Sequence, residues 1–161
     1  MDKEKSKNKK KEGIKKEVEI LDGVTASLIN HELTINGPKG EVKREIKYHK
    51  ISIKIEDKKI IFESDRATKE KKKIIGSLVA HLKNMMRGSK ENHTYTLKIC
   101  SGHFPMNVSV SGSKIIVKNF LGEKIPRVMQ LNEGASIKVD GSMIHVTSPS
   151  KEIAGQVSAC I

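Results

Sequence analysis

The internal repeat constrains this chain most, because a sequence that matches itself in order must fold as two copies of one unit. Three stretches of the first half match three of the second half in the same order: 33–46 with 115–128, 52–55 with 136–139, and 74–82 with 153–161. In the first pair Gly40 stands opposite Gly122. The offset drifts by a few residues only, as changes of loop length require. We therefore predict a tandem duplication.

The apolar spacing in the first copy predicts strands followed by a helix. Leu33 and Ile35 alternate with polar residues before the segment 36–40, and Val42 and Ile46 follow it at even spacing. This pattern is typical of two strands joined by a Gly/Pro turn. Two more strands are predicted over residues 51–55 and 60–63, on either side of a charged turn.

A helix is predicted after these strands, because apolar residues between Ile74 and Met86 recur every three to four positions. We expect it to run roughly from Ala67 to Arg87 and to be ended by Gly88. The fold class is therefore α+β, with two tandem copies of a small antiparallel or mixed β-sheet and one helix packed on one face. Each helix contains a glycine, Gly76 or Gly155, that costs about 1 kcal/mol relative to alanine. Close approach of helix and sheet would explain both.

The chain divides into three parts by composition and repeat. Residues 1–16 contain eight lysines and are predicted to be an extension that is disordered in isolation. Ordering on RNA is left open, and a solubilising or artificially added tail is the alternative. Residues 17–90 form the first repeat and residues 91–161 the second. Because the second helical pattern stops at Ile161, we expect that helix to be truncated by at least a turn and a half.

The charge of the chain favours a polyanionic partner over simple solubility. Its 31 Lys and Arg residues and 19 Asp and Glu residues give a formal net charge of +12. Lysine and arginine gain affinity for nucleic acid by releasing counterions from phosphates. Most of the excess lies in residues 1–90. With three Phe, two Tyr and no Trp, stacking on bases is nearly unavailable, which favours contacts to the RNA backbone.

Several other function classes lack support in the sequence. The two cysteines, Cys100 and Cys160, have no metal-ligand spacing, so neither a zinc site nor a disulfide framework is expected. No apolar run is long enough for a signal peptide or membrane span, so we expect a soluble intracellular protein with no membrane partner. The histidines are scattered, and no nucleophile elbow or phosphate-binding loop occurs. We expect neither catalysis nor a cofactor.

Two motifs of the second half resemble a known family. The stretch Gly102–Val108 reads GHFPMNV, and Lys118–Lys124 reads KNFLGEK; INGPKG at 35–40 is a weaker match. With these motifs the chain is similar, over about residues 18 to 161, to the universal large-subunit ribosomal protein numbered six in bacteria and nine in eukaryotes. The residues of these two motifs resemble the eukaryotic and archaeal branch of that family.

This resemblance implies two copies of one α+β domain and a non-catalytic structural role. The implied partners are the large-subunit rRNA near its sarcin–ricin loop, neighbouring ribosomal proteins and, nearby on the assembled ribosome, translational GTPases. The implied location is the cytoplasmic ribosome, with assembly in the nucleolus if the source is eukaryotic. A free RNA chaperone or regulator and a basic protein-interaction scaffold are the alternatives.

The candidate rRNA-binding residues are cations, and one histidine, in the predicted turns and helix. Glycine-rich turns let the backbone approach a phosphate closely. Cations at the start of a helix interact unfavourably with the helix dipole, at a cost of roughly 0.3–1 kcal/mol each, and an external phosphate would offset that cost. Ordinary hairpin turns, a solvated helix face and, for His103, a structural turn are the alternatives. The set is Lys39, Lys43, Arg44, Arg66, Lys69, Lys71, Lys72, Lys73, Lys83, Arg87, His103, Lys118, Lys124 and Arg127.

Overall fold

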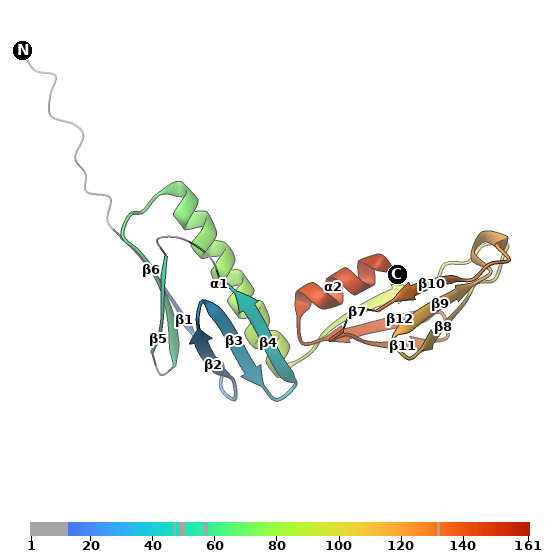
Figure 1. The fold of residues 1–161 in the computed structure, drawn as a ribbon, viewed down its shortest axis with the longest axis horizontal. Helices are drawn as coiled ribbons and strands as arrows, with labels where there is room; N and C mark the ends of the chain where they lie inside the picture. Colours follow the sequence, from blue (N-terminus) through green and yellow to red (C-terminus); the bar gives the residue numbers. More distant parts are fainter. Residues whose placement is uncertain (1–12, 47, 49–50, 57, 132) are drawn as a thin grey trace, which may run out of the picture.

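The chain forms two domains in tandem, each with six strands followed by one helix (Figure 1). The computed structural model describes residues 13–46, 48, 51–56, 58–131 and 133–161. The first domain contains β1 (Ile14–Glu19), β2 (Thr25–Ile29), β3 (Glu32–Gly37), β4 (Gly40–Glu45), β5 (Ser52–Glu56), β6 (Lys59–Ser64) and α1 (Lys69–Lys90). The second contains β7 (His93–Lys98), β8 (Asn107–Ser111), β9 (Lys114–Lys118), the 3₁₀ turn η1 (Phe120–Gly122), β10 (Arg127–Gln130), β11 (Ser136–Asp140), β12 (Met143–Ser148) and α2 (Lys151–Cys160).

The strands confirm the α+β duplication. In the first domain they form two three-stranded sheets, β1-β6-β5 and β2-β3-β4, and the second domain has β7-β12-β11 and β8-β9-β10 in the same positions. Every pairing among the described strands is antiparallel. Each copy therefore has two small sheets, where the sequence predicted one.

The predicted alignment of residues 33–46 with residues 115–128, position by position, was wrong at the turn between the two strands. In the first domain Ile35 pairs with Val42, seven positions later, across the tight turn between β3 and β4. In the second domain the equivalent Val117 pairs with Arg127, ten positions later. The turn between β9 and β10 is thus three residues longer, and it holds η1. An insertion in a surface loop costs little, so it leaves the flanking strands unchanged.

The start of β1 also differs from the prediction. Residues 14–16, which we assigned to the lysine-rich extension, are the first half of β1, where Ile14 pairs with Ser64. The side chain of Ile14 packs against the core of the first domain. The rest of the predicted extension, residues 1–12, lies outside the described residues.

Helix α1 begins close to the predicted residue but ends later. Thr68 is its N-cap, and its hydroxyl accepts a hydrogen bond from the Lys71 amide at 3.3 Å. The predicted stop at Gly88 was wrong, because the helix continues to Lys90. Gly88 is needed for packing: a Cβ there would collide with the carbonyl oxygen of Pro149 and lie 2.9 Å from Cδ2 of His93.

The explanation offered for the two helical glycines was also wrong. A Cβ on Gly76 would meet nothing within 4 Å, so this glycine lies in open space. A Cβ on Gly155 would lie 3.7 Å from the Tyr95 hydroxyl, an ordinary contact. Neither position requires glycine for contact between helix and sheet.

The two domains have hydrophobic cores of different size. The first core joins both sheets to one face of α1 and includes Ile35, Phe62 and Leu82, which are 0–1% exposed. The second core has three buried members, Ile144, Val146 and Val157, with partly buried apolar side chains packed around them. Because buried apolar area is the main source of stability, the first domain has the larger reserve.

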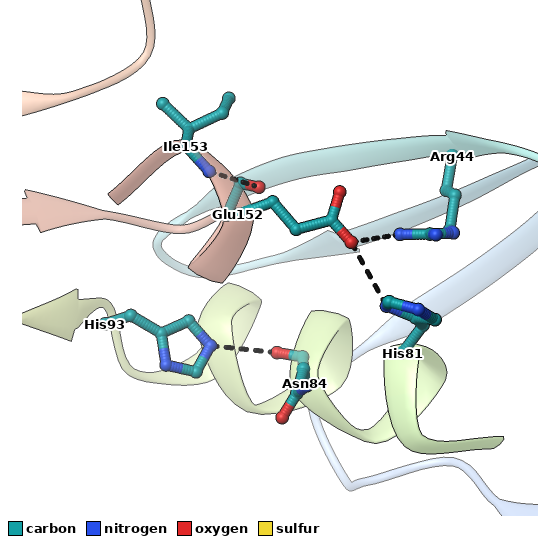
Figure 2. Close-up of polar contacts among 7 residues, drawn as sticks. Arg44, His81, Asn84, His93, Glu152 and Ile153 are labelled. Atoms are coloured by element: carbon teal, nitrogen blue, oxygen red, sulfur yellow. Dashed lines mark hydrogen bonds and ion pairs between the residues drawn. The ribbon is translucent and has the colours of Figure 1, made fainter. Parts of the chain in front are cut away.

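Polar and steric contacts join the two domains at one junction (Figure 2). One carboxylate oxygen of Glu152, at the start of α2, accepts from Arg44 on β4 and lies 3.1 Å from Nδ1 of His81 on α1. Nε2 of His93 lies 3.0 Å from the carbonyl oxygen of Asn84. The close approach of Gly88 to Pro149 adds a backbone contact at the same junction.

Candidate nucleic-acid interface

The predicted cations lie in three separate groups rather than in one site. The first is at the hairpin of β3 and β4, the second is on and before α1, and the third is in the loops around β9 and β10. In Figure 1 the first two groups lie in the domain of α1, whereas the loops next to η1 form the far end of the second domain. The protein thus presents cations at well-separated places.

The hairpin group does not act as a unit. Lys39 is exposed, and its backbone amide donates to the Ser89 carbonyl at 2.9 Å, which anchors the hairpin to the end of α1. Lys43 forms an ion pair with Glu41 at 3.4 Å. Arg44 is occupied by Glu152 at the domain junction. Of these three, Lys39 is the side chain best placed for an external phosphate.

The α1 group is the densest run of cations. Arg66, Lys69, Lys72 and Lys73 are exposed, whereas Lys71 is half-buried. Among the residues that the structure describes, none of these five side chains has an ion pair. The start of α1 is therefore strongly positive.

Lys83 and Arg87 lie in a different electrostatic setting, although both are exposed on α1. They line a hollow between α1 and β1 that also contains Glu17, Glu19 and Glu91. These carboxylates reduce the positive potential at the end of the helix. The cations of α1 are consequently most effective in its first half.

The two family motifs meet at the tip of the second domain. The side-chain amide of Asn119 donates to the carbonyl oxygen of Pro105 at 2.9 Å, which joins loop 101–106 to loop 119–126. A Cβ on Gly122, whose φ is +85°, would lie 3.3 Å from the Phe104 ring. The ring of His103 meets the Phe104 ring edge-on, with centroids 5.3 Å apart. We call these two loops the tip.

A bidentate ion pair braces the tip. Arg127 donates from Nε and Nη2 to the two carboxylate oxygens of Glu123 at 2.9 and 2.7 Å, and its guanidinium lies 4.2 Å from the centre of the Phe120 ring. The hydrogen bond from Arg127 lowers the pKa of the Glu123 carboxyl below its ordinary value, and the same bond raises the pKa of Arg127. Arg127 therefore neutralises Glu123, which leaves the neighbouring Lys124 as the uncompensated charge.

Sequence reasoning missed the apolar part of the tip. In the tip, Ile125 is 80% exposed, Leu121 74% and Phe104 48%, and next to the tip Val128 on β10 is 57% exposed. They lie beside the exposed cations Lys118 and Lys124. The sequence did contain a signal, because apolar residues lie close together between positions 120 and 128. The match with residues 33–46 assigned this segment to two strands and a turn. Exposed apolar side chains gathered in this way mark contact surfaces.

Metal-ligand groups, cysteine pairing and membrane spans also bear on the function of the described part of the chain. No group of three or more His, Cys, Asp and Glu residues in it is placed to hold a metal ion. Both cysteines are exposed and unpaired. None of the described helices has the length and apolar character needed to cross a membrane.

Comparison with known proteins agrees with the motifs at the tip. The family model described as ribosomal protein L6 matches residues 20–92. The chain is 39% identical over 145 residues to the large ribosomal subunit protein uL6 of Natronomonas pharaonis, covering 90% of this chain and 82% of the relative. It is 42% identical over 154 residues to uL6 of Nanoarchaeum equitans (92% and 80%) and 36% identical over 148 residues to uL6 of Methanosarcina mazei (92% and 84%). All three relatives are archaeal, in agreement with the branch that the motifs indicated, and the chain belongs to the ribosomal protein L6 family.

Proposed function

We propose that this protein is a structural, non-catalytic constituent of the large ribosomal subunit that binds rRNA near the sarcin–ricin loop and supports the region where translational GTPases dock. The relatives named above are large-subunit proteins, which supports the first part. The second part rests on the resemblance at the two tip motifs. Its partners are then large-subunit rRNA and neighbouring ribosomal proteins, and its location is the cytoplasmic ribosome.

One observation carries the assignment of the RNA contact to the tip: both motifs converge there around uncompensated cations. Among the described residues, neither Lys118 nor Lys124 has an ion pair, and Arg127 already neutralises the nearest carboxylate, Glu123. Exposed lysines make charge-assisted contacts to phosphate oxygens. Exposed Leu121 and Ile125 can pack against riboses or unstacked bases. A folded RNA surface offers both kinds of contact.

Charge reversal at the tip tests this proposal. We expect Lys124→Glu to weaken binding to a sarcin–ricin-region rRNA fragment about tenfold at ~0.1 M salt, and to lower the slope of log affinity against log salt by about 0.7–0.9 for each phosphate that the protein no longer neutralises. Lys138→Glu is the matched control, because Lys138 is exposed on β11, away from the tip loops. Equal affinities for the fragment in both variants, with folding intact by circular dichroism, would contradict the role of the tip.

The apolar part of the tip favours a second candidate, a basic protein-interaction scaffold. Three large exposed apolar side chains of the tip, with Val128 beside them on β10, resemble the core of a protein interface more than a phosphate-binding surface. Sedimentation of the tagged chain separates the candidates. A ribosomal constituent co-sediments with large subunits in high-salt gradients, whereas a scaffold or a free RNA chaperone sediments in smaller complexes.

A further inference from the structure

The two copies of the duplicated unit differ on the outer face of one sheet, the face turned away from the helix. In the second domain this sheet is β7-β12-β11, and α2 packs against its inner face (Figure 1). Successive side chains of a strand point to opposite faces of the sheet. The outer face, which we call the β12 face, therefore carries Thr94, Thr96 and Lys98 from β7, Met143, His145 and Thr147 from β12, and Ser136, Lys138 and Asp140 from β11.

The equivalent face of the first domain, on β1, β6 and β5, is occupied by its own ion pairs. Its nine residues include four glutamates and three lysines, namely Glu17, Glu19, Glu56, Glu63, Lys15, Lys54 and Lys59. Each of these lysines pairs with a glutamate of the same face, at nitrogen–oxygen distances of 3.1, 3.1, 3.7 and 3.9 Å. Ile61, at the centre of the face, is only 3% exposed. This face therefore has no unpaired lysine for an external phosphate.

Hydroxyl groups replace most of the carboxylates on the β12 face. Four of its nine residues are serine or threonine, whereas the first-domain face has one, Ser52. His145 stands at the central position that Ile61 holds in the first domain, and its Nδ1 lies 3.2 Å from the Thr96 hydroxyl. Within the described chain, Nε2 of His145 has no hydrogen-bond partner. The β12 face thus presents polar groups that are free to bind an outside partner.

The two lysines of the β12 face are uncompensated. Lys98 and Lys138 are exposed, and neither has an ion pair with any residue that the structure describes. The one carboxylate of the face, Asp140, lies at the end of β11, two strand spacings of about 4.8 Å from Lys98 on β7. Glu133, the preceding carboxylate in the chain, lies before β11 begins. By the same strand spacings the two lysines are about 12 Å apart, so each can meet a different phosphate.

The chemistry of the β12 face favours the backbone of an RNA duplex. Lysine, serine and threonine side chains are typical donors to phosphate and sugar oxygens. Double-stranded RNA presents its phosphates and 2′-hydroxyl groups across a wide, shallow minor groove, which suits a flat sheet. The face has no Phe, Tyr or Trp for stacking on the bases of a single strand.

A protein partner fits the β12 face less well. Its three strands cover about 10 by 17 Å, far less than the roughly 800 Å² that each partner contributes to a stable protein interface. Such interfaces have an apolar core, whereas the one apolar side chain of this face is Met143, which is 37% exposed. A few charge-assisted and hydroxyl contacts to an RNA backbone need no such core.

We propose that the β12 face binds the backbone of an RNA duplex and that this contact is separate from the one at the tip. This inference rests on the proposed function, because it adds a second rRNA contact to the same protein. None of the nine residues of the β12 face belongs to the tip loops 101–106 and 119–126, so the two contacts use different side chains. The first-domain face, with its paired lysines, should not take part.

The test compares two lysines on each face, in the full chain. Lys98→Gln/Lys138→Gln removes the free lysines of the β12 face. The control, Lys54→Gln/Lys59→Gln, makes the same charge change on the first-domain face. Exposed ion pairs contribute little to stability, so both variants should fold, which circular dichroism checks. The probes are the sarcin–ricin-region fragment and an unrelated RNA duplex of about 16 base pairs, the length that a double-stranded RNA-binding domain spans.

We expect Lys98→Gln/Lys138→Gln to bind the duplex about tenfold more weakly at ~0.1 M salt, with a slope of log affinity against log salt that is smaller by about 0.9 for each lost phosphate contact. The control should bind the duplex like wild type. The β12-face variant should lose more affinity for the duplex than for the fragment, and Lys124→Glu should show the opposite. Thr94→Val/Thr147→Val keeps every charge and should weaken duplex binding about threefold, because hydrogen bonds are lost.

Several results would overturn the inference. They are unchanged duplex affinity in either variant of the β12 face, an equal loss in the control, and an equal loss for the fragment. Binding of a DNA duplex of the same sequence, or of a poly-glutamate peptide, as tightly as the RNA duplex would also overturn it. A failure of wild type to prefer the fragment over the duplex, with the duplex still lost in Lys98→Gln/Lys138→Gln, would count against the proposed function and leave the β12 face supported.

Discussion

Helix α1 spans 22 residues and α2 spans 10, although each follows six strands arranged in the same two sheets. In the first domain Leu82, Met85 and Met86, from the second half of α1, are buried against the sheets. In the second domain a hollow next to α2 is lined by apolar side chains such as Ile99, Val117 and Ile144. The two copies also differ at their surfaces, because the first has the cationic helix and the second has the apolar tip.

The largest expected effects test the difference between the two cores. Ile60 on β6 and Ile144 on β12 occupy equivalent positions and are both buried. Truncation of a buried isoleucine to alanine costs about 2–5 kcal/mol. We expect Ile60→Ala near the upper end of this range, because Ile60 is fully buried in the large core of the first domain. Ile144→Ala should fall near the lower end, because Ile144 already borders a hollow.

Native-state hydrogen exchange of the β6 and β12 amides measures these two losses separately, even if the domains unfold independently. The Ile60→Val and Ile144→Val pair is a milder control, with costs of about 0.5–1.5 kcal/mol. An equal or larger loss for Ile144→Ala would show that the second core is as complete as the first.

Two glycines of α1 provide the next comparison. Gly88→Ala should destabilise the protein by about 1–3 kcal/mol, because the new Cβ collides with the Pro149 backbone at the junction. Gly76→Ala should stabilise it by about 0.5–1 kcal/mol, because the site is open and alanine favours helix. Urea denaturation measures both changes, and small-angle scattering should detect altered domain orientation in Gly88→Ala alone. Equal effects of the two substitutions would contradict the packing described for the junction.

The smallest effect concerns the brace of the tip. Because Arg127 lowers the pKa of Glu123 in the folded state, the pair contributes stability above the ordinary carboxyl pKa, and this contribution is lost as pH falls through the lowered value. Carbon-detected NMR should show Glu123 titrating below the ordinary glutamate range. In Arg127→Gln we expect its pKa to return toward that range. A Glu123 pKa that does not change in this variant would show that the pair does not form in solution.

Much of the fold could be predicted because it depends on local patterns. Alternation around Ile35 and Val42 identified the β3–β4 hairpin, and the three-to-four-residue period after Ile74 identified α1. The repeat predicted the duplication, since matched apolar positions produce matched strands and helices. The short strand β1 was harder to assign, because four of its six residues are charged and only Val18 is buried.

The candidate sites were predicted only in part, because they depend on contacts between distant residues. The pairing of Arg44 with Glu152 joins residues that are 108 positions apart, so a cation expected to face RNA is used within the protein. The role of Gly88 depends on Pro149, which approaches only when the domains pack. The three-residue insertion before Arg127 turned an expected strand into an exposed apolar loop. The first two of these have no local signature.

The central claim is that the tip lies against rRNA near the sarcin–ricin loop, and directed cleavage from the tip tests it most directly. An iron–EDTA reagent is tethered to Leu121→Cys in a chain whose exposed cysteines are replaced by Cys100→Ser and Cys160→Ser, and the chain is assembled into large subunits. We predict that the strongest rRNA cleavage falls in and beside the sarcin–ricin loop. When the reagent is attached to Lys16→Cys in β1 instead, we expect no cleavage of the sarcin–ricin loop. Strongest cleavage elsewhere from Leu121→Cys, with the sarcin–ricin region uncut, would contradict the account.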